Sequence, residues 1–149
     1  MTGTKSLQTY KKGDLVKQIK GQVAMISTPS ELVRLGNIQI AGESNKHIIA
    51  EMLIELNEFS NISRRMTEAQ IIETVKMLLS KYPNLSLQEY QVFFNKIKSG
   101  YFGQLYESLD GIKIMVFMKE YYREVNTAYI EFKEEKHQEI KRIEGHRDR

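Results

Sequence analysis

The sequence predicts an all-α protein, a compact bundle of about five helices whose long C-terminal helix extends beyond the core. Three separate apolar runs at helical spacing each follow a capping motif, a serine or threonine with a glutamate or glutamine three residues later. A brief alternation over residues 37–43 predicts no more than a loop or an isolated extended piece. The end of the chain joins a long apolar seam to a charged tail, which is typical of a helix longer than its core.

Length and composition indicate one domain. The chain has 149 residues, 41% of them hydrophobic, which is enough for one core of ordinary size. We expect a helical domain over residues 27–132, a basic N-terminal arm or docking segment over residues 1–26, and a charged helical extension over residues 133–149.

The cellular setting follows from what the sequence lacks. There is no cysteine, which excludes a disulfide scaffold, a thiolate zinc site and a cysteine nucleophile. The N-terminus has no apolar leader region, and no segment approaches the ~18 consecutive apolar residues of a membrane span. We therefore expect a soluble, cytoplasmic protein with no membrane partner.

The N-terminal segment concentrates positive charge. Five lysines precede residue 21 and face only one acidic residue there, Asp14; they are Lys5, Lys11, Lys12, Lys17 and Lys20. Such an arm can bind nucleic acid phosphates or an acidic partner. The alternative is a solubilising terminus without a ligand. Residues 13–26 have a partly helical apolar period. Gly21 and two β-branched residues weaken the prediction of a helix there, and the alternative is a docking segment.

The first two helices are expected over residues 29–35 and 45–59. Thr28, Pro29 and Glu31 form a complete helix start, and Gly36 ends the first helix. The apolar face of the second helix consists of Ile48, Ile49, Met52, Leu53, Leu56 and Phe59. His47 has glutamates nearby on the opposite side, but a single histidine without a second ligand helix is a poor metal site, so we expect a solvated face.

The third and fourth helices are expected over residues 68–81 and 87–99, after the capping boxes at Thr67 and Ser86. The apolar stripe of the third helix is Ile71, Ile72, Val75, Leu78 and Leu79. The fourth carries an aromatic stripe of Tyr90, Phe93, Phe94 and Ile97, and Gly100 ends it. Its basic and aromatic end, Lys96, Lys98, Tyr101 and Phe102, could stack a base, but the alternative is an aromatic plug at the end of the bundle.

The last helix is expected over residues 111–140, capped by Ser108 or Asp110. Its seam has the heptad-like spacing of four and three residues and contains Ile114, Met118, Tyr121, Val125, Ala128 and Phe132. Beyond it, residues 131–149 hold six basic and six acidic residues, with Ile140 and Ile143 among them. Such an extension is an oligomerisation element or a surface for a partner; the alternative is a tail that does neither.

Catalysis finds no support in the sequence. His47, His137 and His146 occur in unrelated contexts, and no serine elbow, phosphate loop or carboxylate pair is evident. We expect a non-enzymatic protein with no catalytic residues, no cofactor and no bound metal.

Three features carry a family resemblance that covers about half the chain. They are the helix start mT-x-x-Q-I from Met66 to Ile71, the hydrophobic helix ending near Tyr82, and the turn K-x-G-x-[FY]-G-x-[LI]-Y-x-x-[LI]-D-G from Lys98 to Gly111. The chain resembles a family of small helical proteins encoded by phages and mobile elements of Bacteroidetes. It is also loosely similar to phage helicase-loader and helicase-inhibitor domains, which bind a replicative helicase.

The resemblance implies a phage or mobile-element accessory protein, an adaptor that binds the replication machinery in the host cytoplasm. The alternatives are a virion-associated structural protein, assembling with itself or with other phage components through its C-terminal helix, and a small DNA-binding regulator that uses the lysine arm. We expect a protein partner, or a second copy, to contact Tyr101, Phe102, Tyr106, Tyr122, Tyr129, Ile140 and Ile143.

Overall fold

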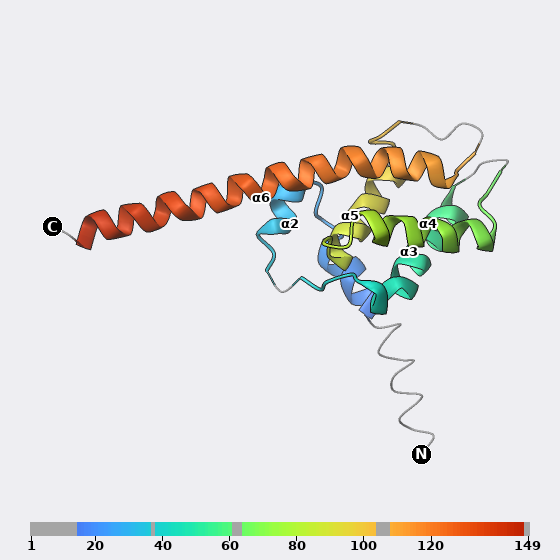
Figure 1. Cartoon of the computed structure of the whole chain (residues 1–149), viewed down its shortest axis with the longest axis horizontal. Helices are drawn as coiled ribbons and strands as arrows, with labels where there is room; N and C mark the ends of the chain where they lie inside the picture. Colours follow the sequence, from blue (N-terminus) through green and yellow to red (C-terminus); the bar gives the residue numbers. More distant parts are fainter. Residues whose placement is uncertain (1–14, 37, 61–63, 104–107, 148–149) are drawn as a thin grey trace, which may run out of the picture.

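The protein is mainly helical over the part of the chain that its computed structural model describes, residues 15–36, 38–60, 64–103 and 108–147. A helix over residues 15–23 is followed by α2 (Pro29–Val33), the 3₁₀ turn η1 (Glu43–Asn45), α3 (Lys46–Phe59), α4 (Glu68–Lys81), α5 (Leu87–Lys98) and α6 (Gly111–Arg147). These ranges contain isolated bridges but no strand. The predicted all-α bundle with a long C-terminal helix is confirmed (Figure 1).

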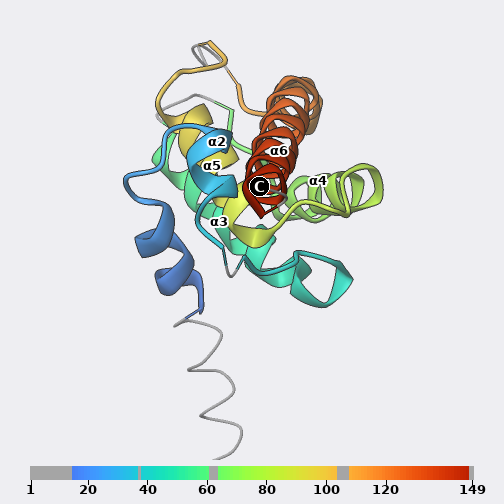
Figure 2. The same cartoon turned by 90° about the vertical axis from the view of Figure 1, so that its left-hand side faces the viewer.

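Helix α5 lies at the centre of the bundle. It packs against α2, α3 and α6, and α4 packs on α3 and α6 (Figures 1 and 2). All but two of its residues are buried. Phe93 stacks on Tyr121 of α6, with 5.4 Å between the ring centroids, so the aromatic stripe of α5 joins the bundle to the last helix.

The capping boxes predicted at Thr67 and Ser86 form as the motif requires. Thr67 Oγ1 accepts from the Gln70 amide at 3.2 Å, and the Gln70 side chain returns a bond to the Thr67 amide. Ser86 and Glu89 make the same reciprocal pair at the start of α5. These bonds satisfy amides that a helix start leaves without partners, which fixes where α4 and α5 begin.

The ten residues that the sequence predicts at the centre of the core are all buried: Leu53, Leu56, Ile71, Val75, Leu78, Phe93, Phe94, Ile97, Met118 and Tyr121. Two residues of the predicted apolar faces are exposed instead. Phe59 is 64% exposed because α3 ends there and Ser60 turns away in an extended conformation. Ile72 is 46% exposed because it lies at the edge of its stripe, beside a cavity between α3 and α4.

The described part of the N-terminal segment belongs to the bundle. Its helix continues through Gly21 despite the weak helical pattern, and Val16, Ile19 and Val23 are buried in the common core. Lys20 forms an ion pair with Glu55 of α3. Packing of one apolar face therefore outweighs the low helix propensity of glycine and the β-branched residues.

Helix α6 is longer than predicted and reaches Arg147. Asp110 rather than Ser108 caps it, because the Asp110 Oδ1 atom accepts from the Lys113 amide at 2.8 Å. Five seam residues are buried: Ile114, Met118, Tyr121, Val125 and Ala128. At 1.5 Å per residue the helix spans about 55 Å, and its outer part projects alone from the bundle in Figure 1.

Candidate partner-binding surfaces

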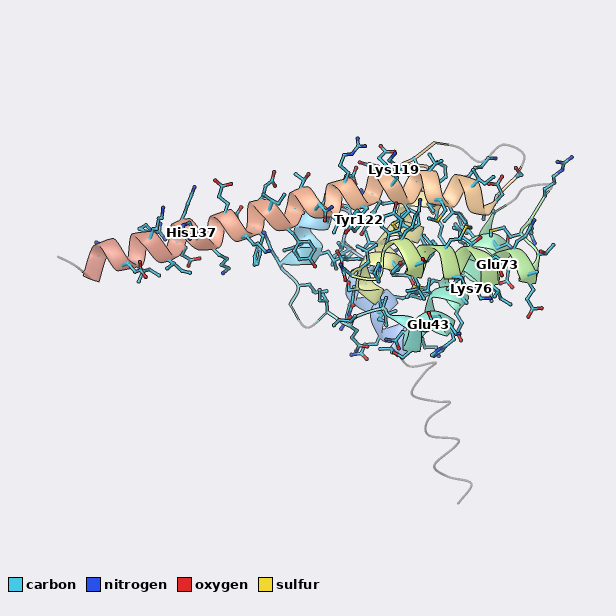
Figure 3. All side chains as sticks on the ribbon, in the orientation of Figure 1. Glu43, Glu73, Lys76, Lys119, Tyr122 and His137 are labelled. Atoms are coloured by element: carbon cyan, nitrogen blue, oxygen red, sulfur yellow. The ribbon has the colours of Figure 1, made fainter. Side chains whose placement is uncertain are left out.

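The outer part of α6 is the largest unpartnered feature of the described chain. Every residue from 133 to 146 is exposed, and Figure 3 shows His137 on the projecting segment, far from the bundle. We call residues 133–146 the extension. It contains four lysines or arginines and four glutamates, so basic and acidic side chains are equal in number.

The extension leaves the bundle at a defined junction with α2. The Arg34 guanidinium lies 5.8 Å from the centroid of the Phe132 ring and donates to Glu135 Oε2 at 2.6 Å. Phe132 is half-buried and is the last seam residue. Both ionic partners are largely exposed, so their pair contributes little to stability. The pair lies at the point on α6 where packing against the bundle ends.

Two isoleucines give the extension an apolar spot. Ile140 is 53% exposed and Ile143 is 48% exposed, and their spacing of three places them next to each other on one helix face. Glu139, Lys141 and Arg142 surround them in sequence. Two adjacent apolar anchors within a charged helix are the pattern by which a helix binds in the groove of another protein.

Two other predicted contact residues on α6 take part in the bundle. Tyr122 is half-buried and packs on Tyr82, with ring centroids 4.8 Å apart. Tyr129 is also half-buried; burial raises the pKa of its hydroxyl, and the neighbouring Glu89 carboxylate raises it further. The structure therefore leaves Ile140 and Ile143 as the most available members of the predicted α6 surface.

The glycine-aromatic turn divides between core and surface. Phe102 stacks on Phe117 of α6, with 5.2 Å between centroids, and also lies near Phe93, so it plugs the end of the bundle. Tyr101 is 52% exposed, and its hydroxyl hydrogen-bonds to Glu124. Lys96 lies 3.7 Å from the centroid of the Tyr101 ring and pairs with the same glutamate. Tyr106 lies outside the described residues.

Tyr101 shares a shallow groove with Phe59, which the sequence places in the core. The groove has a volume of about 560 Å³ and also involves Ala24, Ile26, Ser27 and the end of α5. Lys98 Nζ lies 5.5 Å from the centroid of the Phe59 ring. The exposed aromatic pair is a second candidate surface, and no periodicity identifies it, because it depends on where two helices end.

The predicted nucleic-acid arm is only partly described. Lys5, Lys11 and Lys12 lie outside the described residues. Lys17 is exposed on the first helix, and Lys20 is paired with Glu55, so its charge is partly compensated. Among the residues with described positions, no group of three or more histidine, cysteine, aspartate or glutamate side chains could hold a metal ion.

Sequence reasoning missed the buried polar residues of α5. Gln88 is fully buried; its Oε1 accepts from the Gln39 amide at 2.8 Å and its Nε2 donates to Gln22. Glu89 is nearly as buried, and burial raises the pKa of its carboxyl. The Tyr90 hydroxyl lies within hydrogen-bond distance of two carbonyls at the end of α4. These groups fasten the bundle together, and only the Ser86 capping box signalled one of them.

Comparison with known proteins adds a family to this geometry. The sequence profile of a family of unknown function (DUF6633) matches residues 65–145, more than half of the chain. The chain belongs to this family. The DUF6633 segment covers α4, α5, the glycine-aromatic turn and nearly all of α6, and it therefore contains the whole extension apart from its last residue.

The match excludes the first helix, α2 and α3, although these pack on the same core. No curated protein and no solved structure matches the chain. Over the part of the chain that is described, no helix has the length and apolar character needed to cross a membrane.

Proposed function

We propose that the protein is a non-enzymatic adaptor of phage or mobile-element origin that binds a protein partner through the extension of α6. The observation that carries this proposal is the fully exposed, uninterrupted helix over residues 133–146. The helix projects from the bundle and away from its surface (Figure 1).

The energetics of the extension support a binding role. A helix of this length is only marginally stable in water when nothing packs on it. Ion pairs at helical spacing, such as Lys136 with Glu139 at 3.8 Å, contribute a few tenths of a kcal/mol each. Because the extension continues a packed helix, its helical structure is already nucleated before a partner binds. The extension therefore loses less conformational entropy on binding.

The partner proposed first is the replicative helicase, because the family resemblance points to helicase-loader and helicase-inhibitor domains. A partner for this surface needs a groove with an apolar floor for Ile140 and Ile143 and charges of both signs at its edges. A partner with a uniformly acidic or basic edge would meet like charges on the extension.

The test is capture of a purified phage-host replicative helicase by the immobilised protein. The variant I140S/I143S should weaken capture at least about tenfold, because two apolar anchors are lost. The matched control is I112S/V116S, which alters two exposed apolar residues on the bundle part of the same helix and should leave capture unchanged.

Two outcomes contradict parts of the proposal. Equal capture by the wild type and I140S/I143S would move the binding surface elsewhere, first to the Phe59 and Tyr101 groove. No capture, together with concentration-dependent self-association that I140S/I143S abolishes, would favour the alternative of a protein that assembles through its C-terminal helix.

A further inference from the structure

The cavity between α3 and α4 is an apolar groove of about 300 Å³, outside every surface considered so far. Its floor is formed by Ala50 of α3 and by Ile72, Val75 and Leu79 of α4. We call it the α3/α4 groove. Ile72 is exposed there, although the rest of its apolar stripe on α4 is buried. An uncovered apolar hollow between two helices is the form of site in which a third helix packs.

The rim of the groove carries both signs of charge in balance. On the α3 side Lys46 pairs with Glu43 at 3.1 Å, and on the α4 side Lys76 pairs with Glu73 at 3.5 Å. Because both lysines are already paired, the groove offers an apolar floor rather than a site for a charged ligand. The occupant that fits is therefore an apolar group with balanced charges around it.

The extension of α6 presents such a group. Ile140 and Ile143 lie next to each other on one helix face, and at 3.6 residues per turn Glu139 and Glu144 flank them on either side. Two isoleucine side chains occupy roughly 240 Å³, at the ~30 Å³ that a water-sized group takes up in a liquid. The groove volume of about 300 Å³ accommodates both. The extension has equal numbers of basic and acidic side chains, so it meets no net repulsion at the neutral rim.

We propose that the α3/α4 groove binds the extension of a second copy of this chain, with Ile140 and Ile143 on its apolar floor. A chain's own extension cannot occupy the groove, because α6 is one unbroken helix that projects away from the bundle (Figure 1). Figure 3 shows Lys76 on the bundle and His137 far along the projecting helix. The DUF6633 segment, residues 65–145, contains both the α4 side of the groove and the two isoleucines.

This contact uses the extension on which the proposed function rests, but it has a different receptor. Each chain has one α3/α4 groove and one extension, so two copies can pair reciprocally or several can associate head to tail. Docking of Ile140 and Ile143 on a second copy would compete with capture of the helicase. A variant that blocks only the groove therefore separates the two contacts, since it should lose self-association and keep capture.

The first experiment measures self-association of the full-length protein by sedimentation velocity. A contact with two apolar anchors is weak, so the measurement covers roughly 10 µM to 1 mM. The wild type should shift from monomers to dimers or larger species. I140S/I143S removes the anchors and Ile72→Lys places a charge on the floor, and each should weaken association at least about tenfold. The matched control Met77→Lys alters a similarly exposed residue of α4 outside the groove and should associate as the wild type does.

The second experiment mixes the two variants to decide which surfaces meet. I140S/I143S keeps an intact groove and Ile72→Lys keeps an intact extension, so together they should form heterodimers although neither self-associates. Sedimentation with one variant fluorescently labelled detects these heterodimers. Their absence would overturn the proposal. Wild-type self-association of Ile72→Lys would also overturn it, because the extension would then bind a different surface of the second copy.

A second groove variant covers the case in which Ile72→Lys does not fold. Ala50→Phe fills the floor without adding a charge, and circular dichroism checks its helical content. It should lose self-association in the same way, and a folded Ala50→Phe protein that associates like the wild type would overturn the site. Lost helicase capture with intact self-association would contradict only the adaptor function. Intact capture by a wild type that stays monomeric up to about 1 mM would contradict only the groove contact.

Discussion

The two halves of α6 are one continuous helix in two different surroundings. Over residues 111–132 the helix buries a residue at every third or fourth position, and Met118 and Tyr121 have no exposed surface. Over residues 133–146 every side chain is exposed. The inner half is held by packing, and the outer half by hydrogen bonds within the helix, good helix formers and side-chain ion pairs. Helical structure and burial are therefore separate properties of this segment.

The seam positions change from apolar to charged residues between the two halves. Continued at the same spacing beyond Phe132, the seam would fall on Glu135, Glu139 and Arg142. Charged residues cannot replace Met118 or Val125 against an apolar core without a large desolvation cost. The sequence thus specifies where the bundle ends even though the helix does not end there.

The largest test of this comparison removes one apolar side chain from each half. Met118→Ala should lower the free energy of unfolding by about 2–5 kcal/mol, because it leaves a cavity in the core. Ile140→Ala should change it by less than about 0.5 kcal/mol. Urea unfolding monitored by circular dichroism measures both values. A loss of similar size in the two variants would show that Ile140 is packed in solution.

The second test places the same substitution at a glycine in each half. A Cβ atom at Gly111 would lie 2.6 Å from Thr74 Oγ1, whose hydroxyl donates to the Gln70 carbonyl, so α4 and α6 could not approach as closely. Gly111→Ala should cost about 1–3 kcal/mol through overpacking. A Cβ atom at Gly145 meets nothing within 4 Å.

Gly145→Ala should therefore act in the opposite direction and only locally. It should favour the helix by about 0.5–1 kcal/mol at that position, which amide hydrogen exchange near the end of α6 can detect. The midpoint of global unfolding should not move. If Gly111→Ala also left the free energy of unfolding unchanged, α4 and α6 would not be in close contact at this position.

The third test uses the buried carboxyl of Glu89 in α5, the helix that stacks on the inner half of α6 through Phe93 and Tyr121. Burial raises the pKa of Glu89 above its ordinary value of 4.5, so the folded state binds this proton more tightly than the unfolded state. The contribution of this proton to the free energy of unfolding is present below pH 4.5 and is lost as the pH rises through the raised folded-state pKa of Glu89. Stability should therefore fall over that interval.

Glu89→Gln isolates this effect, because Gln70 already performs the same capping role at the start of α4. The variant should have a flatter dependence of urea midpoint on pH above 4.5 and should be the more stable protein at neutral pH. Identical pH profiles for the two proteins would mean that Glu89 is solvated in the folded state.

The sequence predicted the helices better than the surfaces. Capping boxes and seams are local patterns, and they placed α4 within its observed limits and the ten central core residues correctly. The prediction that Phe59 is buried was wrong because an apolar face is buried only where a neighbouring element covers it, and the end of α3 has no such cover. The cavity beside Ile72 was missed for the same reason, since it depends on the distance between two helices and leaves no pattern in either one.

The smallest expected effect comes from the largest change, deletion of residues 133–149. If the outer half of α6 packs on nothing, its removal should leave the midpoint of thermal unfolding nearly unchanged. Two described side-chain contacts are lost. The exposed pair between Arg34 and Glu135 is worth about 0.2–1 kcal/mol, and Lys136 Nζ no longer lies over the Phe132 ring. Helical ellipticity should fall, because the deleted residues are helical in the intact chain.

Protein concentration decides between the explanations of a larger effect. A loss of more than about 2 kcal/mol that does not depend on concentration would show that the extension packs on its own bundle in solution. A loss that grows with the concentration of the intact protein would show that a second copy covers part of the bundle through the extension, because association stabilises the folded state by mass action. An unchanged midpoint at every concentration, together with lost partner capture, would leave the extension with binding as its role and the inner half of α6 with stability.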